Sequence, residues 1–312
     1  MFSGGLRRAL GDATRCVRAG SVRTFARSAP LRKTVSLEYE LQEPPSTDRD
    51  VAQHTDGVVV CHGLYGSKQN WRSLAKNMAK DFGVPVYTLD LRNHGSSPHA
   101  NTMSYTDMAG DVKRFFADHK LTHCTLIGHS LGGKVAMAMA LDPSLPSGTL
   151  SHLVSVDMSP AEGPISPEFM RYAHTMLEIE RTNVKQRSEA DEILQKVEPN
   201  LGVRQFLLTN LERGENGMHF RIPVQTMIDS LEGIGLFPYA PGKDGAPPER
   251  QWDGPTLFVK GEHSKYINKH NVPVCRDFFP DMELVELPTG HWVQSESPRA
   301  FLECVRGFLL EH

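Results

Sequence analysis

The sequence has no long apolar run, and this absence predicts that no segment spans a membrane. Spanning a bilayer takes about 18 to 20 consecutive apolar residues, and no run in these 312 residues comes near that length. The chain is nevertheless 39% hydrophobic, which is enough to bury a large core. Length and composition therefore predict a globular protein with one sizeable domain or two smaller ones.

Cysteines are few and lack the spacing of a metal site. Five are present, at positions 16, 61, 124, 275 and 304. Their odd number and scattered placement predict neither a disulfide framework nor a zinc site. This use of cysteine fits a reducing compartment.

Acidic residues are almost missing from residues 1–33, where Asp12 stands against eight basic residues. Those are Arg7, Arg8, Arg15, Arg18, Arg23, Arg27, Arg32 and Lys33. A stretch rich in arginine, with serine and alanine but hardly any acid, is typical of a mitochondrial transit peptide. We therefore expect cleavage near Phe25 or Arg27 and a mature domain of residues 34–312, with the matrix as its location. The alternative is a basic arm that contacts nucleic acid. The acidic remainder of the chain argues against a nucleic-acid partner.

Short apolar runs alternate with helical stretches through the rest of the chain. The runs are GVVVCHG, VPVYTLDLR, CTLIGHS, LVSVDMSP, TLFVKGE and ELVELPTGH, preceded by an alternating edge strand at 34–42. Helices are expected at 131–141 and 299–310. Fully apolar strands between helices predict an α/β fold with an open, mostly parallel sheet covered on both faces. Apolar strand-like runs are missing from about 161–248. Polar helical stretches there predict a helical cap inserted into this domain.

The run LIGHSLGGKVAM changes from a strand to a helix at Ser130. Gly128 and Gly132 frame this serine, which is the pattern of a nucleophile elbow, a strained turn that lifts a serine hydroxyl clear of the sheet. Glycine at both positions lets the strand and the helix approach without a clash. A glycine-rich helix entry that holds a phosphate is the alternative. The flanking strand and helix favour the nucleophile.

A serine nucleophile needs a base and an oxyanion hole. His291, between the last expected strand and the last helix, is the predicted base. The backbone N–H groups of Leu64, in HGLYGSKQNW, and of Leu131 are the predicted oxyanion donors. His62 and Gly63 could instead make only a tight turn.

The chain resembles the α/β-hydrolase superfamily, and in particular the family of α/β hydrolase domain-containing protein 11 with its bacterial esterase relatives. The resemblance covers nearly all of residues 34–312. It rests on HGLYGSKQNW, DLRNHGSSP, GHSLGGKVAM, VDMSP, RQFLLTNL and GHWVQSESP, in that order. It implies a serine hydrolase of acyl esters with acylglycerol lipase activity and, for animal members, a mitochondrial location.

The acid of the triad is where the chain departs from the common superfamily pattern. The slot three residues after Gly261 holds Ser264 where aspartate is usual. Asp157, at the end of the preceding core strand, is the preferred acid, in the arrangement attributed to the bacterial relatives. Its alternative role is to cap a turn. Glu262 and then Asp229 are the next candidates.

The leading hypothesis is a carboxylic ester hydrolase that works through an acyl-serine intermediate, with no cofactor and no metal. A thioesterase on the same triad is one alternative, and a protein that binds and protects a ligand or partner is another. Apolar side chains of the cap are expected to form an acyl pocket over Ser130 for lipid-like esters. These are Phe169, Met170, Met176, Leu177, Phe206, Leu207 and Leu208.

Overall fold

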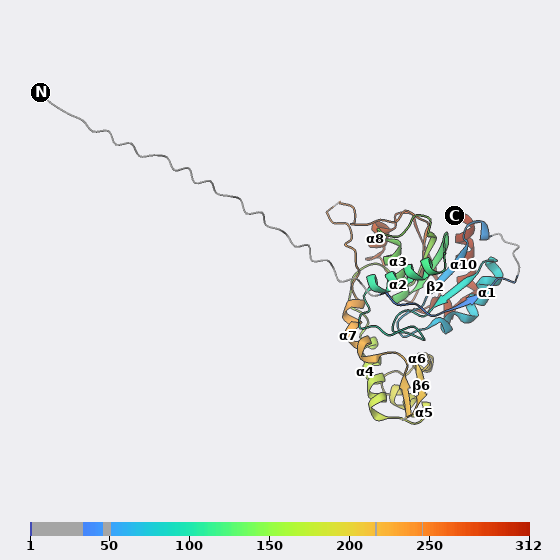
Figure 1. Cartoon of the computed structure of the whole chain (residues 1–312), viewed down its shortest axis with the longest axis vertical. Coiled ribbons are helices and arrows are strands. Elements are labelled where there is room, and N and C mark those ends of the chain that lie inside the picture. The colour runs from blue at the N-terminus through green and yellow to red at the C-terminus, as the bar shows by residue number, and fades with distance from the viewer. Residues whose placement is uncertain (2–33, 46–50, 216, 245) are drawn as a thin grey trace. The chain divides into compact units, whose positions relative to one another are not determined.

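A seven-stranded sheet organises the computed structural model, which describes Met1 and residues 34–45, 51–215, 217–244 and 246–312 (Figure 1). Its strands are β1 (Tyr39–Gln42), β2 (Gly57–Cys61), β3 (Val86–Leu89), β4 (Cys124–His129), β5 (Leu150–Val156), β8 (Thr256–Gly261) and β9 (Met282–Leu287). Their order in space is β1-β3-β2-β4-β5-β8-β9, and β1 pairs antiparallel while the others pair parallel. The predicted open, mostly parallel sheet is confirmed.

Helices cover both faces of this sheet because its strands are apolar on both sides. In β2, Val58 and Val60 belong to one buried cluster and Val59 and Cys61 to the other, and all four are fully buried. The first face packs against α1 (Arg72–Phe82) and α10 (Pro298–Glu311). The second packs against α2 (Tyr105–Asp118), α3 (Leu131–Ala140) and α8 (Val272–Phe278). Two 3-10 turns, η1 (Val51–Gln53) and η2 (Lys68–Trp71), and the short α9 (Val293–Glu296) complete the core.

The chain leaves the sheet after β5 and returns at β8, and most of the intervening residues form a cap (Figure 1). Its elements are α4 (Pro167–Thr182), α5 (Arg187–Gln195), α6 (Leu201–Leu208), the hairpin β6 (Leu211–Gly214) and β7 (Gly217–Phe220), and α7 (Val224–Ile234). Residues 167–195 form two helices, α4 and α5, because Asn183 ends α4 in the left-handed conformation at φ 51°. Asparagine tolerates this conformation better than most residues.

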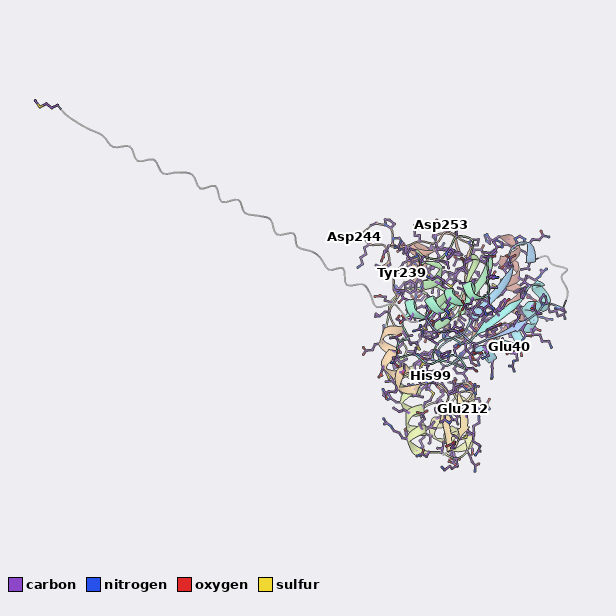
Figure 2. The ribbon with its side chains drawn as sticks, in the orientation of Figure 1. Glu40, His99, Glu212, Tyr239, Asp244 and Asp253 are labelled. Atoms are coloured by element: carbon purple, nitrogen blue, oxygen red, sulfur yellow. The ribbon has the colours of Figure 1, made fainter. Side chains whose placement is uncertain are left out.

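Two features of the cap differ from a purely helical insertion. The β6–β7 hairpin is too short and polar to give a strand signal in the sequence. After Ile234 the chain already returns to the core, where the Trp252 N–H donates to the Phe278 carbonyl at 3.0 Å. A loop of the core also contacts the cap, since His99 Nε2 donates to the Arg221 carbonyl at 2.9 Å (Figure 2).

The predicted transit peptide falls almost entirely on residues 2–33, which lie outside the described residues. Within the part of the chain that the structure describes, no helix is long and apolar enough to cross a membrane.

Candidate active site

Ser130 occupies a strained turn between β4 and α3. Its φ of 53° and ψ of −116° are unusual for a residue with a side chain. A Cβ on Gly132 would lie 2.3 Å from the Cys61 carbonyl oxygen, and one on Gly128 would lie 2.1 Å from the Gly132 oxygen. Glycine is therefore required at both positions for the strand and helix to meet so closely. The turn has the geometry of a nucleophile elbow.

The structure brings Ser130, His291 and Asp157 into one hydrogen-bonded chain. His291 Nε2 lies 3.0 Å from Ser130 Oγ, and His291 Nδ1 lies 2.6 Å from Asp157 Oδ2. Ser130 follows β4, Asp157 follows β5, and His291 lies in the loop after β9. The carboxyl ends of parallel strands share one edge of the sheet, which is why residues so distant in sequence meet there. Asp157 is fully buried.

Three donors converge on the Asp157 carboxylate. The Gly261 N–H donates to Oδ1 at 3.1 Å, while the Ser264 hydroxyl and His291 Nδ1 both reach Oδ2. Ser264 occupies the slot where aspartate is usual, so here that slot supports a carboxylate supplied by the neighbouring strand. The replacement of the usual acid by serine was the sequence signal for this contact.

The two other acid candidates lie apart from His291. The Glu262 side chain is exposed, and its backbone N–H bonds to the Leu287 carbonyl. Asp229 is exposed on α7 and accepts a hydrogen bond from Gln225. Neither carboxylate contacts the imidazole.

Two side chains that are not among the predicted site residues hold His291 in place. His129 Nε2 donates to the His291 backbone carbonyl at 2.9 Å, and the Tyr266 ring stacks on the imidazole with centroids 4.1 Å apart. Burial, followed by the nearby His291, lowers the pKa of His129 to about 3. His129 is therefore neutral at ordinary pH. Its position beside Ser130 in the GHSLG motif was a usable signal, whereas nothing in the sequence marked Tyr266.

Two hydrogen bonds to the Gly63 carbonyl fix the backbone of the HGLYG loop. The Gly63 carbonyl accepts from the Gly66 N–H at 2.9 Å and from His62 Nδ1 at 2.8 Å. Because a trans peptide points its C=O and N–H in opposite directions, these bonds aim the Leu64 N–H away from them. Leu64 and Leu131 both line a cavity with Ser130. Neither of their N–H groups donates to an atom of the described residues.

Two buried histidines lie beneath this loop. His62 Nε2 accepts from the Leu91 N–H at 3.1 Å, and His94 Nε2 accepts from the Tyr65 N–H at 3.2 Å. Burial lowers the pKa of His62 and that of His94, the latter to about 3. Both rings are therefore neutral, with the proton on Nδ1, and serve as hydrogen-bonding supports of the loop backbone.

The DLRNHGSSP segment also supports the core. Asp90 accepts from the backbone N–H groups of Lys68 and Ser96, and Arg92 pairs with Asp111 in the interior. Asn93 accepts from the Ala100 N–H at 2.7 Å, so all three side chains belong to a network that supports the structure of this loop.

Nothing in the described residues marks a metal centre or a reactive thiol. No cluster of three or more His, Cys, Asp or Glu side chains suited to a metal is found there. Cys61, beside the HGLYG loop, is fully buried, and burial raises the pKa of its thiol to about 12. A thiol with so high a pKa is a poor nucleophile.

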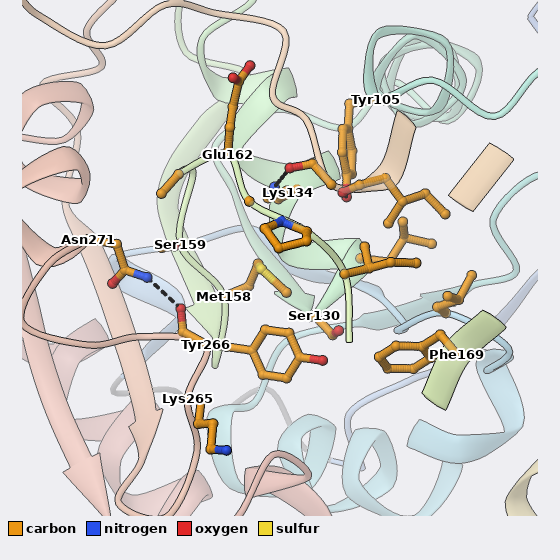
Figure 3. Close-up of a pocket in the computed structure, with 18 of the residues that line it drawn as sticks. Tyr105, Ser130, Lys134, Met158, Ser159, Glu162, Phe169, Lys265, Tyr266 and Asn271 are labelled. Atoms are coloured by element: carbon orange, nitrogen blue, oxygen red, sulfur yellow. Dashed lines mark hydrogen bonds between the residues drawn. The ribbon is translucent and has the colours of Figure 1, made fainter. Parts of the chain in front are cut away.

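Two cavities meet at Ser130. The larger, of about 270 Å³, is drawn in Figure 3, and the smaller has about 50 Å³. Apolar and aromatic side chains that line the larger cavity with Ser130 include Leu64, Leu131, Met158, Ile165, Phe169 and Tyr266. Its polar lining includes Lys134, Glu162, Lys265, Asn268 and Asn271. The smaller lies beside His291 and is lined by Trp71, Phe206 and Trp292 among others.

Only part of the expected cap lining faces Ser130. Phe169 lines both cavities and Phe206 lines the smaller. The other five side chains belong to the hydrophobic core or pack against it, because the helices bury their apolar faces on one another and on the core. Those are Met170, Met176, Leu177, Leu207 and Leu208.

Comparisons with known proteins agree with this architecture. Residues 57–192 match the family model described as the alpha/beta hydrolase fold. An abhydrolase domain-containing protein of Schizosaccharomyces pombe is 38% identical over 89% of this chain and 98% of its own length. The sn-1-specific diacylglycerol lipase ABHD11 of Danio rerio is 36% identical over 81% of this chain and 78% of its own. Among solved structures, a marine microorganism esterase superposes with a TM-score of 0.76 and 32% identity, covering 88% of this chain and all of that one.

The fold, the Ser130 turn and these matches show that the chain belongs to the α/β-hydrolase family, in the group of α/β hydrolase domain-containing protein 11. The resemblance noted in the sequence is thereby confirmed. The expected enzyme class, a carboxylic ester hydrolase, is supported by the same matches.

Proposed function

We propose that this protein hydrolyses carboxylic esters, among them acylglycerols or similar lipid esters, through an acyl-enzyme formed on Ser130. The observation that carries the proposal is the hydrogen-bonded chain from Ser130 Oγ through His291 to the buried Asp157 carboxylate. Relatives named as lipase and esterase over most of the chain support the same chemistry.

In the proposed reaction, Ser130 Oγ attacks the ester carbonyl while His291 Nε2 takes the hydroxyl proton. Asp157 keeps the imidazole in the tautomer protonated at Nδ1 and stabilises the imidazolium. The N–H groups of Leu64 and Leu131 bind the oxyanion of the tetrahedral intermediate. When that intermediate collapses, the C–O bond to the alcohol breaks and Nε2 returns the proton to the leaving oxygen.

A water molecule then repeats the sequence on the acyl-enzyme. His291 Nε2 removes a proton from the water as it attacks, and the second tetrahedral intermediate releases the carboxylic acid. Ser130 regains its proton from Nε2, so the residues end as they began. Every step uses side chains and backbone groups of this chain, and the proposal includes no cofactor.

Each of the two cavities is proposed to bind one part of the ester. The smaller lies on the side of His291 and Trp292, where the leaving oxygen must collect its proton, so we assign it to the alcohol. The larger, which many apolar side chains line, is then the acyl cavity. An apolar cavity of this kind favours acyl chains over phosphate or peptide groups.

We expect kcat/KM to rise from acetate to medium-chain esters of one alcohol, because added methylene groups fill the larger cavity. A gain of about tenfold per well-placed methylene is at the lower end of what a hydrophobic pocket provides. The measurement is a series of 4-nitrophenyl esters of increasing chain length, with a phosphomonoester and a peptide amide as controls. A steady fall beyond acetate, or faster turnover of either control, would contradict this assignment.

A thioester passes through the same tetrahedral intermediate, so the thioesterase alternative is tested by the same series. Oxygen esters and thioesters with matched acyl groups isolate the effect of the leaving atom. We expect the oxygen ester to have the larger kcat/KM. A consistent preference for the thioester would identify a thioesterase.

We further propose that the protein functions in mitochondria, on the basis of the arginine-rich composition of residues 1–33. Expressed in animal cells with a C-terminal tag, the full chain should be recovered in the mitochondrial fraction, with a new N-terminus between about residues 20 and 35. A matched chain that starts at Thr34 after an added methionine should stay outside. A full-length cytosolic product would exclude the leader.

A further inference from the structure

Lys134 is a buried cation one helical turn beyond Ser130 on α3. Only 4% of its surface is exposed, and it lines the larger cavity. Its ammonium makes no ion pair with any carboxylate of the described residues, and Glu162, which lines the same cavity, lies beyond ion-pair distance. Burying an ammonium group is costly unless hydrogen bonds compensate. The hydrogen-bond partners of the ammonium group therefore indicate the role of Lys134.

Those partners are backbone carbonyls at the point where the cap returns to the core. Lys134 Nζ donates to the Gly235 carbonyl at 3.2 Å and to the Leu236 carbonyl at 3.0 Å (Figure 3). Both carbonyls directly follow α7, the last helix of the cap. The C-terminal end of a helix has unpaired carbonyls and a partial negative charge, so an ammonium group is favourable there.

A second side chain of the core binds the same segment. The Tyr105 hydroxyl donates to the Ile234 carbonyl at 2.8 Å, and the Lys134 ammonium lies 5.6 Å from the centre of the Tyr105 ring. The Gly235 carbonyl also accepts from the Gly163 N–H at 3.0 Å, which joins the outgoing and returning connections of the cap. Three consecutive carbonyls, at 234 to 236, are thus held by donors from α2 and α3.

The segment held in this way is a wall of the acyl cavity. Ile234 and Gly235, where the chain returns to the core, line the cavity. Gly163, Pro164 and Ile165, where the chain leaves the core, line it as well. Ser130 and Lys134 lie on successive turns at the start of one helix. A displacement of the wall at Lys134 therefore changes the space available to an acyl group bound to Ser130.

Building on the proposed function, we propose that Lys134 is a positioning residue that fixes the cap's return segment against the nucleophile helix and so sets the acyl-chain selectivity. It acts through the wall and does not touch the reacting atoms. The side-chain environment is consistent with this role, since burial lowers the Lys134 pKa to about 8 while Glu162 opposes that shift. The other titratable groups that line the cavity are Tyr105, Glu162, Lys265 and Tyr266.

The test compares Lys134→Met with the wild type across the 4-nitrophenyl ester series. Methionine is similar in length and buries well but donates no hydrogen bond. We expect the ratio of kcat/KM for the preferred ester to that for acetate to fall by about tenfold, the order expected when a pocket loses its fit to a methylene or two. Lys134→Arg, which retains donors for both carbonyls, should restore a large part of the ratio.

Matched controls separate selectivity from stability. Lys113→Met removes a lysine of α2 that pairs with Asp142 and bonds to Ser144, and it should leave the ratio unchanged. A variant that is only less stable would lose activity on all esters in proportion. If Lys134→Met does not fold, Tyr105→Phe removes the bond to Ile234 alone and should shift the ratio in the same direction.

Two outcomes would overturn the proposal. One is an unchanged ratio in folded Lys134→Met, or in Tyr105→Phe if the former does not fold. The other is a selective loss of activity on 4-nitrophenyl esters whose acyl chain ends in a carboxylate, which would make Lys134 a binding site for an anionic acyl end. Failure of the proposed function is distinct from both, because the wild type itself would then turn over no ester in the series.

Discussion

Replacing Ser130 with alanine should lower kcat for ester hydrolysis by about five to six orders of magnitude while the protein stays folded. The variant has no hydroxyl to attack the carbonyl, and His291 Nε2 then has no proton to remove. His291→Ala should cause a loss of the same order, since the two groups act as a unit.

Fluorophosphonate labelling gives the measurement an independent readout. The wild type should be labelled covalently and Ser130→Ala should not. Ser159→Ala is a matched control, because Ser159 is also buried and lines the larger cavity but forms no hydrogen bond with His291 or Asp157. It should label like the wild type. Purified Ser130→Ala that retains more than a tenth of the activity would rule out the proposed mechanism.

Asp157→Asn should lower kcat by about 10⁴. Three hydrogen-bond donors point at this side chain, from Gly261, Ser264 and His291. An amide has a single acceptor oxygen, and its NH₂ group would face one of those donors or force the imidazole into the wrong tautomer. The histidine would then lose the orientation that lets Nε2 accept the serine proton.

Measuring kcat for Glu262→Gln as well shows which of the two carboxylates matters more for catalysis. Because the Glu262 side chain is exposed and forms no hydrogen bond with the imidazole, the kcat of Glu262→Gln should stay within a few-fold of the wild type. Thermal unfolding of both variants checks that any loss comes from the chemistry. A larger loss in Glu262→Gln than in Asp157→Asn would assign the acid to Glu262.

The sheet and the Ser130 turn were predictable from the sequence for physical reasons. Parallel strands buried on both faces must be apolar throughout, so runs such as GVVVC mark them in any sequence. The turn at Ser130 leaves room only for a hydrogen atom in place of a side chain at positions 128 and 132, so both positions must be glycine. In both cases the structural constraint acts on neighbouring residues, so a short stretch of sequence is enough to reveal it.

The remaining details depend on contacts between distant segments. Tyr266 stacks on His291 only because the chain after β8 crosses the loop after β9, and no local pattern carries that information. The direction of each cap side chain is similarly decided by which helix packs where. Met176 and Leu207 are apolar, as pocket residues are, but both lie in the buried core. Helical spacing marks an apolar face without saying what covers it.

The bond between the Gly163 N–H and the Gly235 carbonyl also has an evolutionary consequence. The cap departs from the core and rejoins it at neighbouring points, so an insertion of different length or sequence could be exchanged there without stretching any strand of the sheet. Ser130, Asp157 and His291 all lie outside residues 164–234. Descendants of one ancestral hydrolase could thus acquire new substrates by replacing a module while inheriting the same proposed triad.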